Sequence, residues 1–97
     1  MPAFIFVEVN DVPTELAGVV DGTDYAGQNS PRDIGSQVNQ PPILYRKQAA
    51  GDPDPDPNTI NRAVVPAFGT GQFSPESGYK IFVWTLGGVT TLVLADR

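Results

Sequence analysis

The chain has 97 residues, no cysteine, no histidine and a formal net charge of −5. Without cysteine there are no disulfides and no cysteine-ligated zinc, and without histidine the commonest metal ligand and the usual general base near neutral pH are missing. Acidic chains are also poor partners for nucleic acid and anionic membranes, which select clustered Lys and Arg. The composition argues against an enzyme and predicts no cofactor, metal, nucleic-acid or membrane partner.

Glycine and proline are both abundant, with ten of each, and only 18% of residues are charged. This balance indicates one loop-rich β domain over residues 1–97, part of whose surface is covered by neighbours. The charge is uneven, because residues 1–59 carry −6 and residues 60–97 carry +1. Residues 1–9 lack the basic start of a signal peptide, so we expect a protein that acts without secretion.

The first predicted strand covers residues 2–9, which are apolar on both faces except near the end. Residues 10–13 break this strand with turn chemistry. Residues 16–20 then fit a short strand that turns at Asp21-Gly22 into residues 23–26. A helical turn over residues 13–17 is the alternative for this part of the chain.

A long polar loop or arm is predicted over residues 27–42, which are rich in Gln, Asn, Ser, Gly and Pro. Loops of this length are uncommon in a compact domain, so this one is expected either to lie on a neighbour or to be held by the body. A short strand follows over residues 43–47.

Alternating aspartate and proline residues make up most of residues 51–58. Each proline fixes φ and biases the preceding residue toward extended geometry, so this Asp-Pro segment is predicted to be a stiff spacer. A further extended run over residues 60–68, limited by Pro66, and a loop over residues 69–78 complete the middle of the chain.

The C-terminal segment, residues 79–97, has the strongest hairpin pattern in the chain. Two runs of β-branched, aromatic and aliphatic residues flank Gly87-Gly88, and glycine readily adopts the positive φ that a two-residue type I′ turn needs. Both faces of this hairpin are apolar, which predicts a covering layer on each side and pairing with the first strand. The predicted fold is all-β, a small β-sandwich or partly open β-barrel with long Pro/Gly-rich loops and a C-terminal β-hairpin.

The Asp-Pro segment also resembles the start of a calcium-binding loop. Oxygen-bearing side chains occupy its first, third, fifth and seventh positions, which are Asp52, Asp54, Asp56 and Asn58. The pattern then fails, because Pro57 stands where a sharp turn needs glycine and Ala63 stands where a bidentate Glu is required. Alternating prolines hold the carboxylates apart along a rod. A solvated connector is therefore expected, with cation binding as the alternative.

Two other patterns have a structural and a functional interpretation. The sequence Asp21-Gly22-Thr23 has the wrong order for the Asp-Thr-Gly loop of an aspartic protease, so a β-turn is expected there. Trp84 together with Tyr79, Phe82 and Tyr45 offers aromatic rings for sugar stacking, but aromatics in a two-sided apolar ribbon are more often core. No catalytic residue is assigned.

The apolar faces of the first strand and the C-terminal segment are the predicted contact surfaces for a neighbouring subunit. The interface candidates on these two segments are Phe4, Phe6, Ile81, Phe82, Val83, Trp84, Leu92 and Leu94. We therefore expect a structural subunit of a larger assembly and a homo-oligomer.

Small, cysteine-free, acidic, Gly/Pro-rich β proteins of this kind resemble virion proteins of tailed bacteriophages, in particular capsid decoration or cement subunits. The resemblance implies a protomer, often a trimer, that stabilises a shell by bridging subunits such as the major capsid protein. Such a protein is made in the host cytoplasm and located in the virion, with a cytoplasmic location as the alternative. The alternative function is a monomeric β-sandwich binding module for a carbohydrate or protein ligand.

Overall fold

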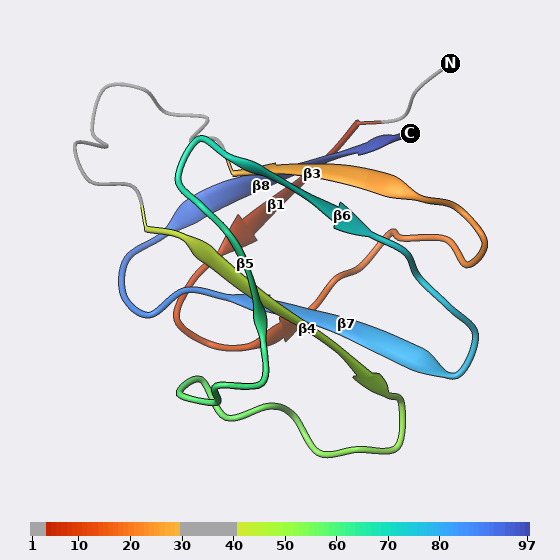
Figure 1. Ribbon diagram of the computed structural model, residues 1–97, viewed down its shortest axis with the longest axis horizontal. Helices are drawn as coiled ribbons and strands as arrows, with labels where there is room; N and C mark the ends of the chain where they lie inside the picture. The colour runs from red at the N-terminus through yellow and green to blue at the C-terminus, as the bar shows by residue number, and fades with distance from the viewer. Residues whose placement is uncertain (1–3, 30–40) are drawn as a thin grey trace.

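The computed structural model describes residues 4–29 and 41–97, and all regular structure in these residues is β (Figure 1). Eight strands form two four-stranded antiparallel sheets that pack together, so the predicted all-β sandwich is confirmed. Sheet A contains, in spatial order, β1 (Phe4–Val9), β8 (Thr90–Asp96), β3 (Tyr25–Asn29) and β6 (Thr70–Phe73). Sheet B contains β2 (Thr14–Glu15), β7 (Tyr79–Trp84), β4 (Ile43–Ala49) and β5 (Ala63–Val65).

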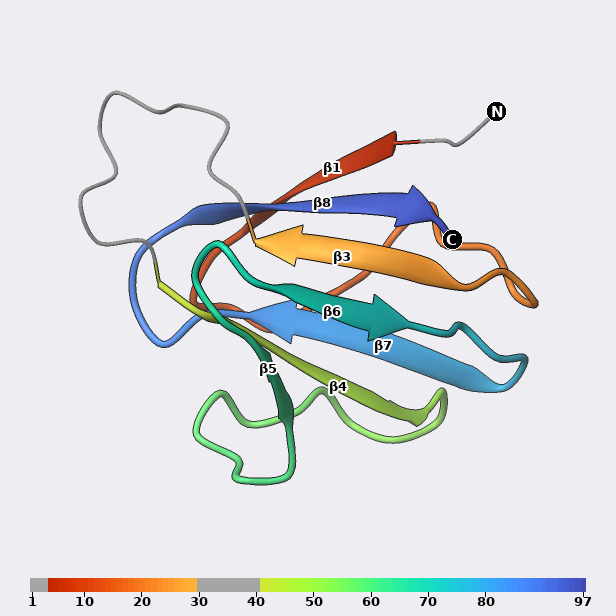
Figure 2. The same cartoon turned by 45° about the horizontal axis from the view of Figure 1, so that its top comes forward.

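Most connections carry the chain from one sheet to the other, and only β4 and β5 are both consecutive and paired (Figure 2). The predicted C-terminal hairpin over residues 79–97 is therefore wrong. Gly87 and Gly88 do have positive φ, at 138° and 89°, but their turn joins β7 in sheet B to β8 in sheet A. The Thr85 amide donates to the Asn10 carbonyl at 2.8 Å, so the chain leaves β7 by bonding to a different loop.

Pairing between the first strand and the C-terminal segment is confirmed for β8. The register places Val7 opposite Leu92 and Ile5 opposite Leu94. Along β1, alternate side chains point to the two sides of the sheet, as the sequence pattern predicts, with Val9 buried and Phe4 exposed. The inward row of β1 and β8 packs against sheet B in the main core.

The main core lies between the two sheets and combines aliphatic and aromatic side chains. Its buried members are Val9, Leu16, Tyr25, Ile43, Val65, Phe73, Ile81, Val83, Leu92 and Leu94. The rings of Tyr45 and Phe73 meet with their centroids 4.7 Å apart and join β4 to β6 across the sandwich. This layer accounts for one face of β7 and one face of β8.

Strand structure occurs in two places where the sequence predicts loops. Residues 27–29 belong to β3, and residues 70–73 form β6, which pairs with β3. Gly27 and Gly71 are opposite each other in that pair because no side chain fits there: a Cβ on Gly27 would lie 2.0 Å from Cε2 of Phe73. The remainder of the predicted 27–42 loop, residues 30–40, lies outside the described residues.

Asn29 ends β3 as a fully buried polar residue that connects three segments. Its Nδ2 donates to the Val65 carbonyl at 3.2 Å and to the Pro41 carbonyl at 3.0 Å. Its Oδ1 accepts a hydrogen bond from Thr90 Oγ1 at 3.0 Å. Buried polar groups require such partners, so these bonds explain why a polar residue ends a central strand.

Smaller differences concern the strand limits. The strand predicted over 43–47 extends to Ala49, and the run predicted over 60–68 is strand only over Ala63–Val65, where Pro66 follows. Residues 13–17 contain the two-residue strand β2 in place of a helical turn. A turn forms at Asp21-Gly22 as predicted, but it leads from sheet B to sheet A and closes no hairpin. In the residues described, no helix is long and apolar enough to cross a membrane.

Candidate interaction surface

The outer face of sheet A carries an exposed apolar surface that begins at β1. Cross-strand register places Phe4, Ala95 and Ala26 in one row, and Phe6, Val93 and Gln28 in the next. Side chains in one row lie on the same side of a sheet, so these residues share the face that points away from the core. Phe4 is 62% exposed and Phe6 is 53% exposed. We call this surface, formed by Phe4, Phe6, Val93 and Ala95, the sheet A patch.

The patch continues to a sheet edge. β1 is the end strand of sheet A, and within the described residues only β8 pairs with it. An edge strand of six residues presents backbone N–H and C=O groups on its outer side, where another chain can add a strand. Glu8 follows the two phenylalanines on the outward row of β1, so the apolar part of this edge is limited to its first half.

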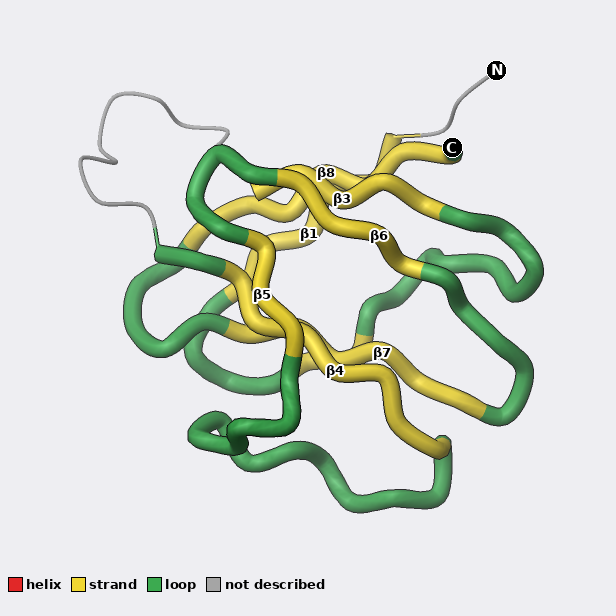
Figure 3. Tube along the Cα trace, viewed as in Figure 1, coloured by secondary structure: helices red, strands yellow, loops and turns green. Residues whose placement is uncertain are grey.

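The outer face of sheet B is covered by the chain itself. Leu44, Phe82 and Trp84 form a second buried cluster, separate from the main core. Residues 52–57, which we call the strap, are part of the segment that joins β4 to β5 (Figure 3). The indole N–H of Trp84 donates to the Pro57 carbonyl at 2.9 Å, and Gln48 Nε2 donates to the Pro53 carbonyl at 2.8 Å.

These two hydrogen bonds refine the interpretation of residues 51–58 as a stiff, solvated connector, because the segment is also bound to the sheet. The strap is rich in proline, and the sheet holds it at two carbonyls. Proline supplies no N–H, so the carbonyl is the backbone group of these residues that can bond to a side chain. The predicted layer on the second face of β7 is thus a segment of the same chain.

The predicted interface residues divide into two groups. Phe4 and Phe6 lie exposed in the sheet A patch. The other six are at most 6% exposed and belong to the core or to the cluster below the strap: Ile81, Phe82, Val83, Trp84, Leu92 and Leu94. The prediction that these six residues contact a partner is therefore wrong, because the folded chain buries them. The sequence does not identify Val93 and Ala95 as members of this surface, because they join it only through the register between β1 and β8.

The rings considered for sugar stacking are not assembled into an exposed platform. Trp84 and Phe82 are buried, so the core interpretation is confirmed for both. Tyr79 is 49% exposed, with the ammonium of Lys47 lying 5.4 Å from its ring centroid. The Asp21-Gly22 sequence forms the expected turn, in which the Thr23 amide donates to the Val20 carbonyl at 3.2 Å.

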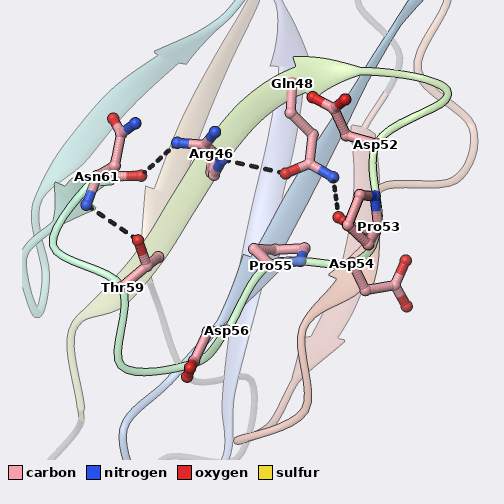
Figure 4. Close-up of a pocket in the computed structure, with 9 residues that line it drawn as sticks. All are labelled: Arg46, Gln48, Asp52, Pro53, Asp54, Pro55, Asp56, Thr59 and Asn61. Atoms are coloured by element: carbon pink, nitrogen blue, oxygen red, sulfur yellow. Dashed lines mark hydrogen bonds between the residues drawn. The ribbon is translucent and has the colours of Figure 1, made fainter.

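A shallow pocket of about 300 Å³ lies between the strap and β4 (Figure 4). Arg46 and Gln48 form its base, with Arg46 Nε donating to Gln48 Oε1 at 3.0 Å. The three strap carboxylates point in different directions in Figure 4. Across residues 4–29 and 41–97, no group of three or more acidic side chains is placed to hold a metal ion. The strap carboxylates therefore do not converge as the alternative interpretation, cation binding, would require.

No family model matches the chain, and no match was found among curated proteins or solved structures.

Proposed function

We propose that this chain is a non-enzymatic structural subunit of a larger assembly, of the capsid decoration or cement type. The observation that carries the proposal is the difference between the two outer sheet faces. On sheet B the chain covers its own aromatic cluster with the strap, whereas on sheet A two phenylalanines are more than half exposed beside Val93 and Ala95. Contiguous apolar surface of this kind is typical of protein–protein contact sites.

The proposed mechanism combines apolar burial with strand addition. Burying apolar surface stabilises a complex by roughly 25 cal/mol per Å² before the costs of association are subtracted. Strand pairing at β1 would add backbone hydrogen bonds and fix the register of the partner. Stable interfaces bury more than about 1,000 Å² in total, so the patch and the edge must act together. The partner is a protein subunit of the same assembly, either a second copy in a closed oligomer such as a trimer or a major capsid protein, and the proposed location is the virion.

The alternative of a monomeric carbohydrate-binding module has less support. It would need exposed aromatic rings on a common face, and the tryptophan that would lead such a platform is fully buried under the strap. The proposed subunit uses the opposite sheet, where the exposed rings belong to an edge strand.

Substituting Phe4→Lys places a charge in the patch without removing any buried side chain. We expect the variant to unfold at the same denaturant concentration as the wild type and to lose self-association. Val12→Lys is the matched control, because Val12 is 60% exposed in the loop between β1 and β2. Its oligomeric mass should equal that of the wild type. Equal loss of association in both variants would show that added charge, and not the patch, governs the mass.

A further inference from the structure

A second shallow pocket, of about 270 Å³, gathers positive charge at the edge of β4. Its lining residues are Tyr45, Arg46, Lys47, Asn61, Arg62 and Ala63. Half of the six Lys and Arg residues in the sequence therefore meet at one pocket, although the chain has a net charge of −5. No carboxylate is among the residues that line it.

The two arginines of this pocket are held by neutral groups. Arg46 donates from Nε to the Gln48 amide oxygen and from Nη1 to the Asn61 carbonyl, each at 3.0 Å. Arg62 donates from Nη1 to the Thr59 carbonyl. The ion pairs found in the described chain involve Lys47 with Glu76 and Lys80 with Glu15, so neither arginine has a carboxylate within 4.0 Å. Both guanidinium charges are positioned without being neutralised.

Arg62 also carries an unsatisfied donor. Its Nε is the one buried side-chain nitrogen or oxygen without a hydrogen-bond partner in the described residues. A buried donor left in this state is unfavourable. Arg62 thus brings a guanidinium that no carboxylate neutralises to the pocket that Arg46 also lines, whereas the Lys47 ammonium is paired with Glu76.

The backbone of β4 adds a donor at the same edge. The Ala50 amide bonds to the Gly78 carbonyl on the β7 side. Successive residues of a strand point to alternate sides, so the N–H of Lys47 points away from β7. β5 pairs with β4 only as far as Tyr45 opposite Ala63, and in the described chain no strand pairs with Lys47 on that side. This N–H therefore faces the open edge at the pocket.

We propose that this pocket binds a small oxyanion, a carboxylate or phosphate group, through Arg46, Arg62 and the Lys47 amide. Guanidinium groups match such anions because they donate two parallel hydrogen bonds in a fixed plane. The aspartates of the strap line the other side of Arg46 and repel long polyanions, which restricts the ligand to a compact anion. This site is independent of the sheet A patch, because it lies on sheet B.

The test is a titration of the full chain with sodium phosphate and with sodium acetate, followed by the backbone amide resonances. Sodium chloride at equal ionic strength is the reference. We expect saturable shifts at Lys47 and Arg62 with at least one of the two anions. Arg62→Gln and Arg46→Gln should each weaken binding by about tenfold or more, as expected for the loss of charge-assisted hydrogen bonds.

Arg97→Gln is the matched control, since it removes the same charge next to the end of β8 on sheet A. It should change binding less than about twofold, within the range of long-range screened charge effects. The proposal is overturned if neither anion shifts these amides beyond the chloride reference, or if the control weakens binding as much as the pocket variants. Which anion saturates the shifts identifies the bound group: acetate indicates a carboxylate, and phosphate indicates a phosphate group.

Discussion

Substituting Gly27→Ala tests the packing that defines β3 and β6. Alanine in place of glycine within a strand normally gains roughly 0.5–1 kcal/mol, because glycine loses more backbone entropy on folding. Here the new Cβ would lie 2.0 Å from Cε2 and 2.7 Å from Cδ2 of Phe73, a ring that is only 1% exposed. Overpacking of this kind costs about 1–3 kcal/mol, and the enclosed ring places it at the upper end. The expected net loss is about 2 kcal/mol.

Urea unfolding followed by the fluorescence of the single tryptophan measures this loss. Combining the substitution with Phe73→Leu should recover at least about 1 kcal/mol relative to the sum of the single variants, because the two sites are in contact. Gly51→Ala is the control, since a Cβ there would meet nothing within 4 Å, and we expect a change within about 0.5 kcal/mol. Gly27→Ala with wild-type stability, or with no coupling to Phe73, would refute the proposed arrangement of β3 and β6.

Two further predictions concern the strap and a strained turn. Replacing the three prolines of the strap by glycine should shift the Trp84 emission to longer wavelength and increase its quenching by acrylamide. Replacing the three aspartates of the strap by asparagine should change neither property. Equal responses of the two variants would contradict the covering role of the strap. Phe68 has a positive φ of 58° and is 69% exposed, so Phe68→Asn should stabilise the chain by about 1 kcal/mol in urea unfolding. Ile60→Asn, at a 93% exposed position without positive φ, should stay within about 0.5 kcal/mol, and a similar gain there would reject backbone strain as the cause.

The sequence predicts best those features that depend on neighbouring residues. Alternation along residues 2–9 assigns the correct faces of β1, because a strand has a side-chain period of two. Pro66 follows directly after β5, as expected from its missing N–H. The positive φ of Gly87 and Gly88 is likewise a local property.

Failures occur where the partner of a segment lies far away in the sequence. A Gly-Gly turn predicts that the chain reverses, but not whether the next strand joins the same sheet or the opposite one. Residues 27–29 of β3 and all of β6 look like loops because the volume beside Gly27 and Gly71 is filled by Phe73 and Val65. Their apolar contacts come from side chains elsewhere in the chain, and hydrophobic periodicity along one segment does not predict such contacts.

The candidate surface also combines features that the local sequence predicts with features that depend on distant segments. Two-faced apolarity correctly indicates that β7 is covered on both sides, and the chain supplies that cover through the strap, which reads as a polar spacer. The same rule identifies Phe4 and Phe6, which the described chain leaves more than half exposed. Local pattern thus predicts which faces need a cover, whereas tertiary structure decides which of them the chain covers itself.

The most direct test of the central claim is the solution mass of the wild-type chain, measured by light scattering across a dilution series. The account predicts a discrete oligomer that dissociates on dilution and whose formation protects the amides of β1 from hydrogen exchange. The contradicting result is a monomer at every concentration whose β1 amides exchange as fast as those of an unpaired edge. If no added shell subunit protects these amides either, the sheet A patch is not an assembly surface.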